Sequence, residues 1–238
     1  MKKIMISVLM IAILSLFIVG CSSNNATTTT TQPSSIVTRT TITVTPVQPT
    51  STTLPPKPLP DDVKSLVAKA NAATSISYKE VDTKDFIYIK GDNAKRALFA
   101  YRGVKDNERY DTVFLDLKNK KAYAACTAND VRCNAQIRKK YWEVSYDEFK
   151  PGKTPLDFMK LIYEASLNSK MTKTIQGTVT INMQFKDLEG NTGEMWVDTF
   201  YGVPYEATIN GATAYYDMVV VNRVADSDVM IPKDYLQI

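Results

Sequence analysis

The sequence contains no histidine among its 238 residues, only three cysteines, and no aspartate or glutamate in its first sixty positions. Without histidine the chain lacks the Ser-His-Asp and Cys-His catalytic sets, the HExxH zinc site and the imidazole switch near neutral pH. Carboxylate, lysine or tyrosine chemistry remains possible.

Charge is distributed unevenly along the chain. The first sixty residues hold four of the 29 Lys and Arg residues, so 25 remain beyond that point together with all 25 acidic residues. The formal net charge of +4 therefore belongs to the N-terminal segment. Nucleic-acid binding normally requires a basic field, which a neutral domain does not provide. We expect no nucleic-acid partner.

The first twenty residues are typical of a lipoprotein signal peptide. Two lysines follow Met1, and an apolar run from Ile4 to Val19 comes next, broken only by two serines. A helix of this run spans ~24 Å, which is short of a hydrocarbon core of ~30 Å. Gly20 before Cys21 resembles the lipobox of secreted lipoproteins, in which the cysteine is lipidated. The alternative is an uncleaved N-terminal anchor. Both predict that the rest of the chain is held at the extracytoplasmic face of the cell membrane.

Residues 21–60 have the composition of a disordered stalk. Positions 26–54 hold 13 Thr, 3 Ser, 3 Pro and one charge, and four further prolines follow by residue 60. Such a tract has too little apolar surface to offset its ordering entropy. The sequon at Asn25 is a possible N-glycosylation site within it. We interpret the segment as a spacer between the membrane and a folded domain of residues 61–238.

The sequence pattern of residues 61–238 predicts two helices and a series of short strands. Asp61 is a plausible N-cap for a helix to about Ala73, and Pro155 begins a second helix that the apolar pattern extends to Ser166. Between them the hydrophobic period is two, which indicates strands. The expected strands are 75–81, 85–90, 94–102, 110–117, 120–126 and 141–146.

The C-terminal third has the clearest alternation. From Gln176 to Lys186 apolar and polar residues alternate without a fault, and tight turns lead into three further strands at 193–199, 205–209 and 213–222. About ten strands and two or three helices without βαβ alternation predict the α+β class with a dominant antiparallel sheet.

Cys126 and Cys133 are separated by six residues after a strand. Two nearby cysteines outside the cytoplasm usually pair, and closure of so short a loop contributes roughly 2–3 kcal/mol. A metal pair is disfavoured because the chain offers no histidine and no further cysteine to complete four ligands. The spacing is not that of a CxxC redox pair. We predict a structural disulfide and no metal site.

The end of the chain resembles the LolA-like lipoprotein-carrier superfamily. Four segments resemble elements of that family in the same order. They are an acidic-aromatic strand at 194–198, a Gly-x-Pro hairpin at 201–207, a returning strand at 221–224 and a closing Ile-Pro segment at 229–232. The resemblance covers about residues 190–235.

This resemblance implies a strongly curved antiparallel sheet, an incomplete barrel, with helices packed on its concave side around an apolar cavity for acyl chains. Val179, Ile181, Met183, Phe185 and Trp196 would then line the cavity. A lipidated chain on a stalk departs from the soluble carriers, which shuttle freely. The fold is therefore expected to carry over better than the shuttle activity.

We interpret the chain as a monomeric lipoprotein that binds a lipid or the acyl chain of another protein, without catalysis and without a cofactor. One alternative is a surface interaction module with a packed core that binds protein or glycan. A second is a carboxylate-dependent hydrolase of the cell envelope. Its acids would come from the strand carboxylates Asp111, Asp116, Glu194, Asp198 and Asp217.

Overall fold

The computed structural model describes residues 58–103, 109–128, 133 and 136–238. The signal peptide of residues 1–20, the lipid attachment at Cys21, the sequon at Asn25 and the stalk up to residue 57 lie outside the described residues.

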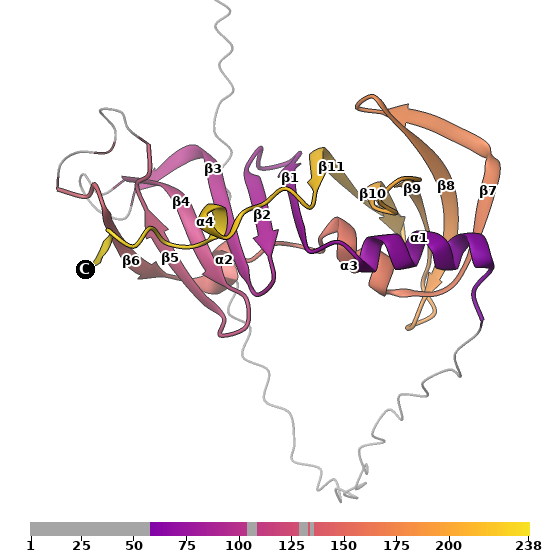
Figure 1. Cartoon of the computed structure of the whole chain (residues 1–238), viewed down its shortest axis with the longest axis horizontal. Helices are drawn as coiled ribbons and strands as arrows, with labels where there is room; N and C mark the ends of the chain where they lie inside the picture. The colour runs from indigo at the N-terminus through magenta and orange to yellow at the C-terminus, as the bar shows by residue number, and fades with distance from the viewer. Residues whose placement is uncertain (1–57, 104–108, 129–132, 134–135) are drawn as a thin grey trace, which may run out of the picture. The chain divides into compact units, whose positions relative to one another are not determined.

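In the described residues, twelve strands form one sheet in the order β12-β6-β5-β4-β3-β2-β1-β11-β10-β9-β8-β7 (Figure 1). Neighbouring strands are antiparallel except β12 and β6, which are parallel. The strand bounds are β1 Ser75–Glu80, β2 Phe86–Lys90, β3 Asn93–Gly103, β4 Arg109–Asp116, β5 Lys121–Ala125, β6 Lys140–Val144, β7 Ile162–Ile175, β8 Thr178–Asp187, β9 Thr192–Asp198, β10 Pro204–Ile209, β11 Ala212–Val221 and β12 Leu236–Gln237.

Four helices accompany the sheet in this part of the chain: α1 Asp61–Asn71, α2 Tyr146–Phe149, α3 Pro155–Lys160 and α4 Asp226–Val229. None of the described helices has the length and apolar content that a membrane span requires.

The sheet is curved and unclosed, with β12 and β7 at its two ends. At one end the β7–β8 hairpin bends back as far as β11. Gln176 at its tip donates from Nε2 to the carbonyl of Tyr216 at 3.0 Å and accepts from the amide of Met218 at 2.7 Å. Because β9 and β10 lie between β8 and β11, these two bonds require strong curvature of the sheet.

Helices α1 and α3 cover one face of the C-terminal strands. Val63 and Leu66 of α1 and Met159 of α3 pack in one buried cluster with Met183 and Met195 of the sheet. Val63, Met183 and Met195 have no exposed surface. Apolar burial of this kind contributes roughly 25 cal/mol per Å².

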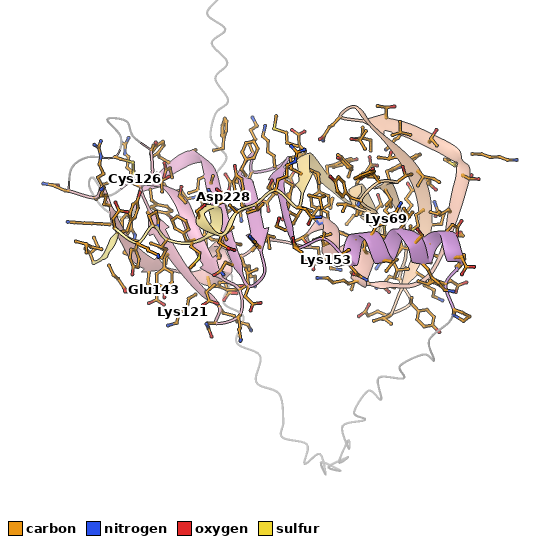
Figure 2. The ribbon with its side chains drawn as sticks, viewed as in Figure 1. Lys69, Lys121, Cys126, Glu143, Lys153 and Asp228 are labelled. Atoms are coloured by element: carbon orange, nitrogen blue, oxygen red, sulfur yellow. A yellow bond between two sulfur atoms is a disulfide. The ribbon has the colours of Figure 1, made fainter. Side chains whose placement is uncertain are left out.

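The turn between β9 and β10 lies directly against α1. Gly202 has a φ of +70°, and a Cβ atom there would lie 2.1 Å from the carbonyl oxygen of Leu66. Lys69 of α1, labelled in Figure 2, donates to the carbonyl of Thr199 in the same turn at 2.8 Å. Only glycine fits this close approach of turn and helix.

Strands β2 to β6 have a second core on the side of α2. Tyr110 packs edge-to-face with Trp142 and with Phe149 of α2, at ring distances of 6.0 Å in both pairs. The C-terminal segment runs past these strands, with α4 against β2 and β3 (Figure 1). Lys90 of β2 pairs with Asp226, the first residue of α4, at 3.1 Å.

Two sequence predictions about α1 and α3 were wrong in their bounds. Pro60, not Asp61, is the N-cap of α1, and its side chain makes no cap bond. The helix that begins at Pro155 ends at Lys160, and β7 starts at Ile162. Apolar and polar residues alternate from Tyr163 to Ser166, and pairing with β8 satisfies the backbone of this segment in the strand.

The sequence pattern did not predict strand β12 or the short helices α2 and α4, and the other expected strands differ most from the structure at β7 and β8. No element was predicted for residues 167–175, which complete the 14-residue strand β7. Gln176 was placed in a strand but forms the hairpin turn with Gly177, and both have positive φ, at 51° and 78°.

We predict that Gly202→Ala destabilises the chain far more than Gly211→Ala. Both glycines have positive φ, at 70° and 79°, so the backbone strain is matched, but a Cβ at Gly211 meets nothing within 4 Å. The control should cost about 1 kcal/mol. Gly202→Ala must also push the turn off α1. Equal free energies of unfolding in urea would contradict the close packing of turn and helix.

Candidate functional site

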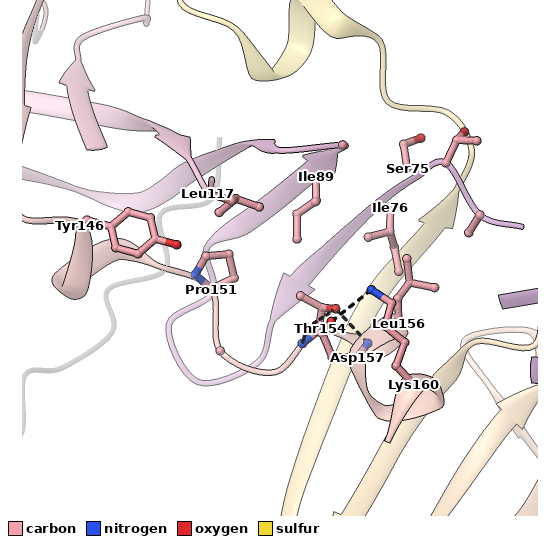
Figure 3. A pocket seen from close by; sticks show the side chains of 14 residues that line it. Ser75, Ile76, Ile89, Leu117, Tyr146, Pro151, Thr154, Leu156, Asp157 and Lys160 are labelled. Carbon is pink, nitrogen blue, oxygen red and sulfur yellow. Dashed lines mark hydrogen bonds and ion pairs between the residues drawn. The ribbon is translucent and has the colours of Figure 1, made fainter. Parts of the chain in front are cut away.

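A pocket of about 400 Å³ lies where the two cores of the sheet meet (Figure 3). Ile89 packs against both clusters and is part of the lining. The lining residues are Ala73, Thr74, Ser75, Ile76, Ile89, Gly91, Leu117, Tyr146, Pro151, Gly152, Thr154, Leu156, Asp157 and Lys160.

One part of the pocket lining is aliphatic, and the rest is polar or backbone. Ile76 of β1 and Ile89 of β2 are paired across the two strands, so their side chains lie side by side. Leu117 follows β4, and Leu156 comes from the first turn of α3. Four aliphatic side chains from four separate parts of the chain therefore converge on one space.

One wall of the pocket is the segment that joins β6 to α3, including Tyr146 and Pro151. It is anchored at two points. Buried Arg96 of β3 donates from Nη1 to the carbonyl of Phe149 at 3.2 Å, and Tyr216 of β11 donates from its hydroxyl to the carbonyl of Lys153. These two bonds hold the wall to the sheet on either side of Pro151.

The Arg96 guanidinium itself is fixed by two carboxylates. Its Nε donates to Asp85 at 2.8 Å, and its Nη2 donates to Glu80. Asp85 also accepts from the amide of Phe99 at 2.8 Å. Arg96 and Asp85 are only 8% and 4% exposed, so the ion pair is shielded from water.

Polar groups gather at the start of α3. Thr154 and Asp157 form a capping box: the Thr154 hydroxyl and amide donate to Asp157 Oδ2 at 2.8 and 3.0 Å, and the Asp157 amide donates to the Thr154 hydroxyl at 3.2 Å. Lys160 lies 3.6 Å from the other Asp157 oxygen, and its side chain is 63% exposed. The Asp157 carboxylate is thus occupied in the helix cap, while the Lys160 ammonium faces solvent.

The structure does not bring the five predicted lining residues into one site. Met183 and Phe185 are buried in the cluster beneath α1 and α3, with Ile181 packed against it. Val179 is 58% exposed near the β7–β8 turn. Trp196 alternates with buried Met195 and Val197 and therefore lies on the opposite face of the sheet.

Trp196 takes part in a different arrangement. The Lys173 ammonium lies 4.2 Å from the centroid of its indole ring and 2.6 Å from the Glu206 carboxylate. A cation over an aromatic ring and beside a carboxylate is stabilised by both.

The predicted disulfide between Cys126 and Cys133 is present (Figure 2). Both cysteines are buried beside Ile137, with Cα atoms 5.6 Å apart. The bond closes the loop that follows β5, and neither cysteine lines the pocket.

The strand carboxylates of the hydrolase alternative serve separate local contacts. Asp111 accepts from the amides of Thr127 and Ala128, and Asp198 accepts from the amides of Phe200 and Tyr201. Asp116 binds Asn119, Asp217 lies 4.0 Å from Lys79, and Glu194 accepts from Gln184.

Sequence reasoning missed most of the pocket residues. Leu156 was placed on the apolar face of its helix, but Ile89, Leu117 and Tyr146 were assigned only to strands. Their meeting depends on how the segment before α3 folds back onto β2, and no local pattern signals that. The Pro151-Gly152 pair is the one local sign, since it marks an irregular segment between β6 and α3.

No family model matches the sequence, and no curated protein matches it. Solved structures that the chain is similar to include MucB, with a TM-score of 0.36 at 10% identity over 73% of this chain and 62% of MucB. The chain thus spans less than two thirds of the length of MucB.

The lipoprotein LppX of Mycobacterium tuberculosis is similar with a TM-score of 0.36 at 10% identity, over 70% of this chain and 96% of LppX. A LolA superfamily protein from Nitrosomonas europaea is similar with a TM-score of 0.26 at 9% identity, over 71% and 97%. Likenesses at these TM-scores are too loose to transfer a ligand, a partner or an activity.

We predict that Arg96→Met lowers the free energy of unfolding by about 3–5 kcal/mol, because it leaves two carboxylates without their buried partner. Arg102→Met is the matched control. Arg102 pairs with Glu148 at 2.5 Å, but both side chains are about half exposed, at 45% and 53%, so its loss should cost at most about 1 kcal/mol. Chemical denaturation of both variants tests this. Equal losses would show that the Arg96 network does not anchor the wall.

A second prediction concerns alkaline pH. Burial, followed by the nearby Asp157 and Glu80 charges, raises the pKa of Tyr216 well above its ordinary value of about 10. Its contribution to stability is therefore complete below pH ~10 and is lost as pH rises toward the folded-state pKa. The free energy of unfolding should fall above pH ~10, and less steeply in Tyr216→Phe. If the free energy of unfolding fell equally steeply with pH in both proteins, Tyr216 would not be the source of the loss of stability at alkaline pH.

Proposed function

We propose that this chain is an extracytoplasmic protein, anchored in the membrane through Cys21, that binds the acyl chain of a lipid or lipoprotein in the pocket between its two cores, without catalysis. The observation that carries the proposal is the convergence of Ile76, Ile89, Leu117 and Leu156 on one space of about 400 Å³. Sites for small ligands commonly measure ~300–1,000 Å³ and are mostly apolar with a few placed polar groups.

The polar groups at the start of α3 favour a ligand with an anionic head. Asp157 Oδ2 is held in the capping box and its Oδ1 lies 3.6 Å from Lys160, whose exposed ammonium has further N–H donors that can reach a ligand. A fatty carboxylate or a phosphate head would pair with it, while the alkyl part lies against the aliphatic floor. Placement at the membrane surface follows from the lipobox, which would bring the pocket near its source of ligand.

The buried state of Met183 and Phe185 favours a second candidate. These residues are packed beneath α1 and α3 rather than around a space, as expected for an interaction module with a solid core. In that case partners would meet an outer surface of the sheet, and the pocket would be a minor feature.

We predict that the full-length chain binds a fluorescent C16 fatty acid. The Gly152→Trp substitution should weaken the affinity for this probe at least tenfold. Gly152 lines the pocket, and a Cβ there meets nothing within 4 Å, so an indole can fill the space without a backbone clash. The matched control is Ala212→Trp, which replaces an exposed residue of β11. This variant should bind the probe as the unmodified chain does. Fluorescence titration measures both.

The Lys160→Ala substitution tests the contribution of the ligand's charged head group separately from that of its alkyl chain. It should weaken binding of the free acid several-fold and leave the methyl ester of the same probe unchanged, because only the acid carries the charge. Failure of the unmodified chain to take up the acid, or equal uptake by Gly152→Trp, would contradict the proposed function.

A further inference from the structure

A polar trough crosses the sheet on the face opposite α1 and α3, and it shares no residue with the pocket beside Ile89. It consists of two adjoining hollows of about 340 and 250 Å³ along β7 to β10, which share Gln184, Thr192 and Gly193. The lining contains side chains that alternate with the buried Met183 and Met195, so the trough lies on the outer side of this part of the sheet.

Strand register arranges the lining in two parallel rows. In the first row Ser166, Gln184, Glu194 and Thr208 are successive cross-strand partners. The second row lies two residues away from the first on each strand. In it Glu164 pairs with Lys186, and Lys186 pairs with Thr192. The row ends at Asn210, whose amide donates to the carbonyl of Thr192. The backbone of Phe185 and Gly193 forms the floor between the rows.

The dimensions follow from sheet geometry. Two residues along a strand separate the rows by ~7 Å, and three strand spacings from β7 to β10 give a length of ~14 Å. The trough is therefore narrow, shallow and elongated, and it runs across the strands rather than along them.

The side chains of the trough are hydroxyls, amides, two carboxylates and one ammonium. Several are held in place by their neighbours: Gln184 donates to Glu194 at 2.9 Å, Asn210 donates to Asn191 at 2.9 Å, and the hydroxyls of Thr208 and Thr213 are 2.9 Å apart. Groups fixed in this way lose little entropy when a ligand binds.

We propose that this trough binds a short, neutral oligosaccharide. Sugar hydroxyls donate and accept hydrogen bonds, which matches rows that alternate amide, hydroxyl and carboxylate groups. Glu164 and Glu194 against Lys186 give the lining a formal charge of −1, which disfavours phosphorylated, sulfated or uronic polymers. The two rows contain no apolar side chain to hold an alkyl chain.

The same geometry argues against an extended peptide. Peptides that bind sheets usually add to an edge strand, where free backbone groups pair with them. The floor of the trough belongs to β8 and β9, which are paired on both sides. Over this floor a ligand is recognised by side chains, as a saccharide can be, and only the end of the trough at β7 lies at a sheet edge.

The test is calorimetric titration of the full-length chain, in a detergent without sugar groups, with chitotetraose, cellotetraose, maltotetraose and mannotetraose. At least one should bind with a Kd in the micromolar to low millimolar range. Thr192→Trp places an indole in the trough at an exposed position and should weaken that binding at least tenfold.

Thr174→Trp is the matched control, since Thr174 is an exposed threonine of β7 outside the trough, and it should bind as the unmodified chain does. Absence of binding to all four sugars, equal binding by Thr192→Trp, or tighter binding of tetragalacturonate than of the neutral sugars would overturn the proposal. Neither Trp variant touches the acyl pocket, so uptake of the fatty acid should stay unchanged in both.

Discussion

The guanidinium of Arg96 lies between two carboxylates and a helix carbonyl in the interior of the folded part, and the pocket beside Ile89 depends on this contact. Asp85 and Glu80 hold the cation, and the cation holds Phe149 at the end of α2. A buried ion pair of this kind adds little net stability, but loss of one partner is costly. Its consequence here is positional: it ties the segment before α3 to the sheet, and that segment is the wall of the pocket.

The curvature of the sheet separates two kinds of surface. On one side, α1 and α3 close the C-terminal strands into a solid core, and a glycine in the β9–β10 turn lets α1 approach. On the other side, polar residues of β7 to β10 stay at the surface, and Gln176 fastens the hairpin tip to β11. An acyl chain and a sugar would therefore meet opposite faces of the same sheet, in sites that share no residue.

The sequence predicted the strands well wherever the alternation was regular and the turns were marked. The hairpin at Asn210-Gly211 and the pairing of Cys126 with Cys133 both follow from local chemistry. It failed where two patterns overlap: residues 162–166 suit a helix face and a strand equally, and only pairing with β8 decides between them. Expecting Trp196 on the same face as Met183 required the exact register between β8 and β9, which single-strand patterns do not supply.

Native mass spectrometry of the full-length chain, purified from a membrane-containing host before and after extraction with organic solvent, tests the central claim most directly. The account predicts a reproducible adduct of lipid mass beyond that of the lipidated chain, which extraction removes and which Gly152→Trp lacks. A chain that carries no such adduct, and that takes up no added fatty acid after extraction, would show that the space beside Ile89 is not an acyl-binding site.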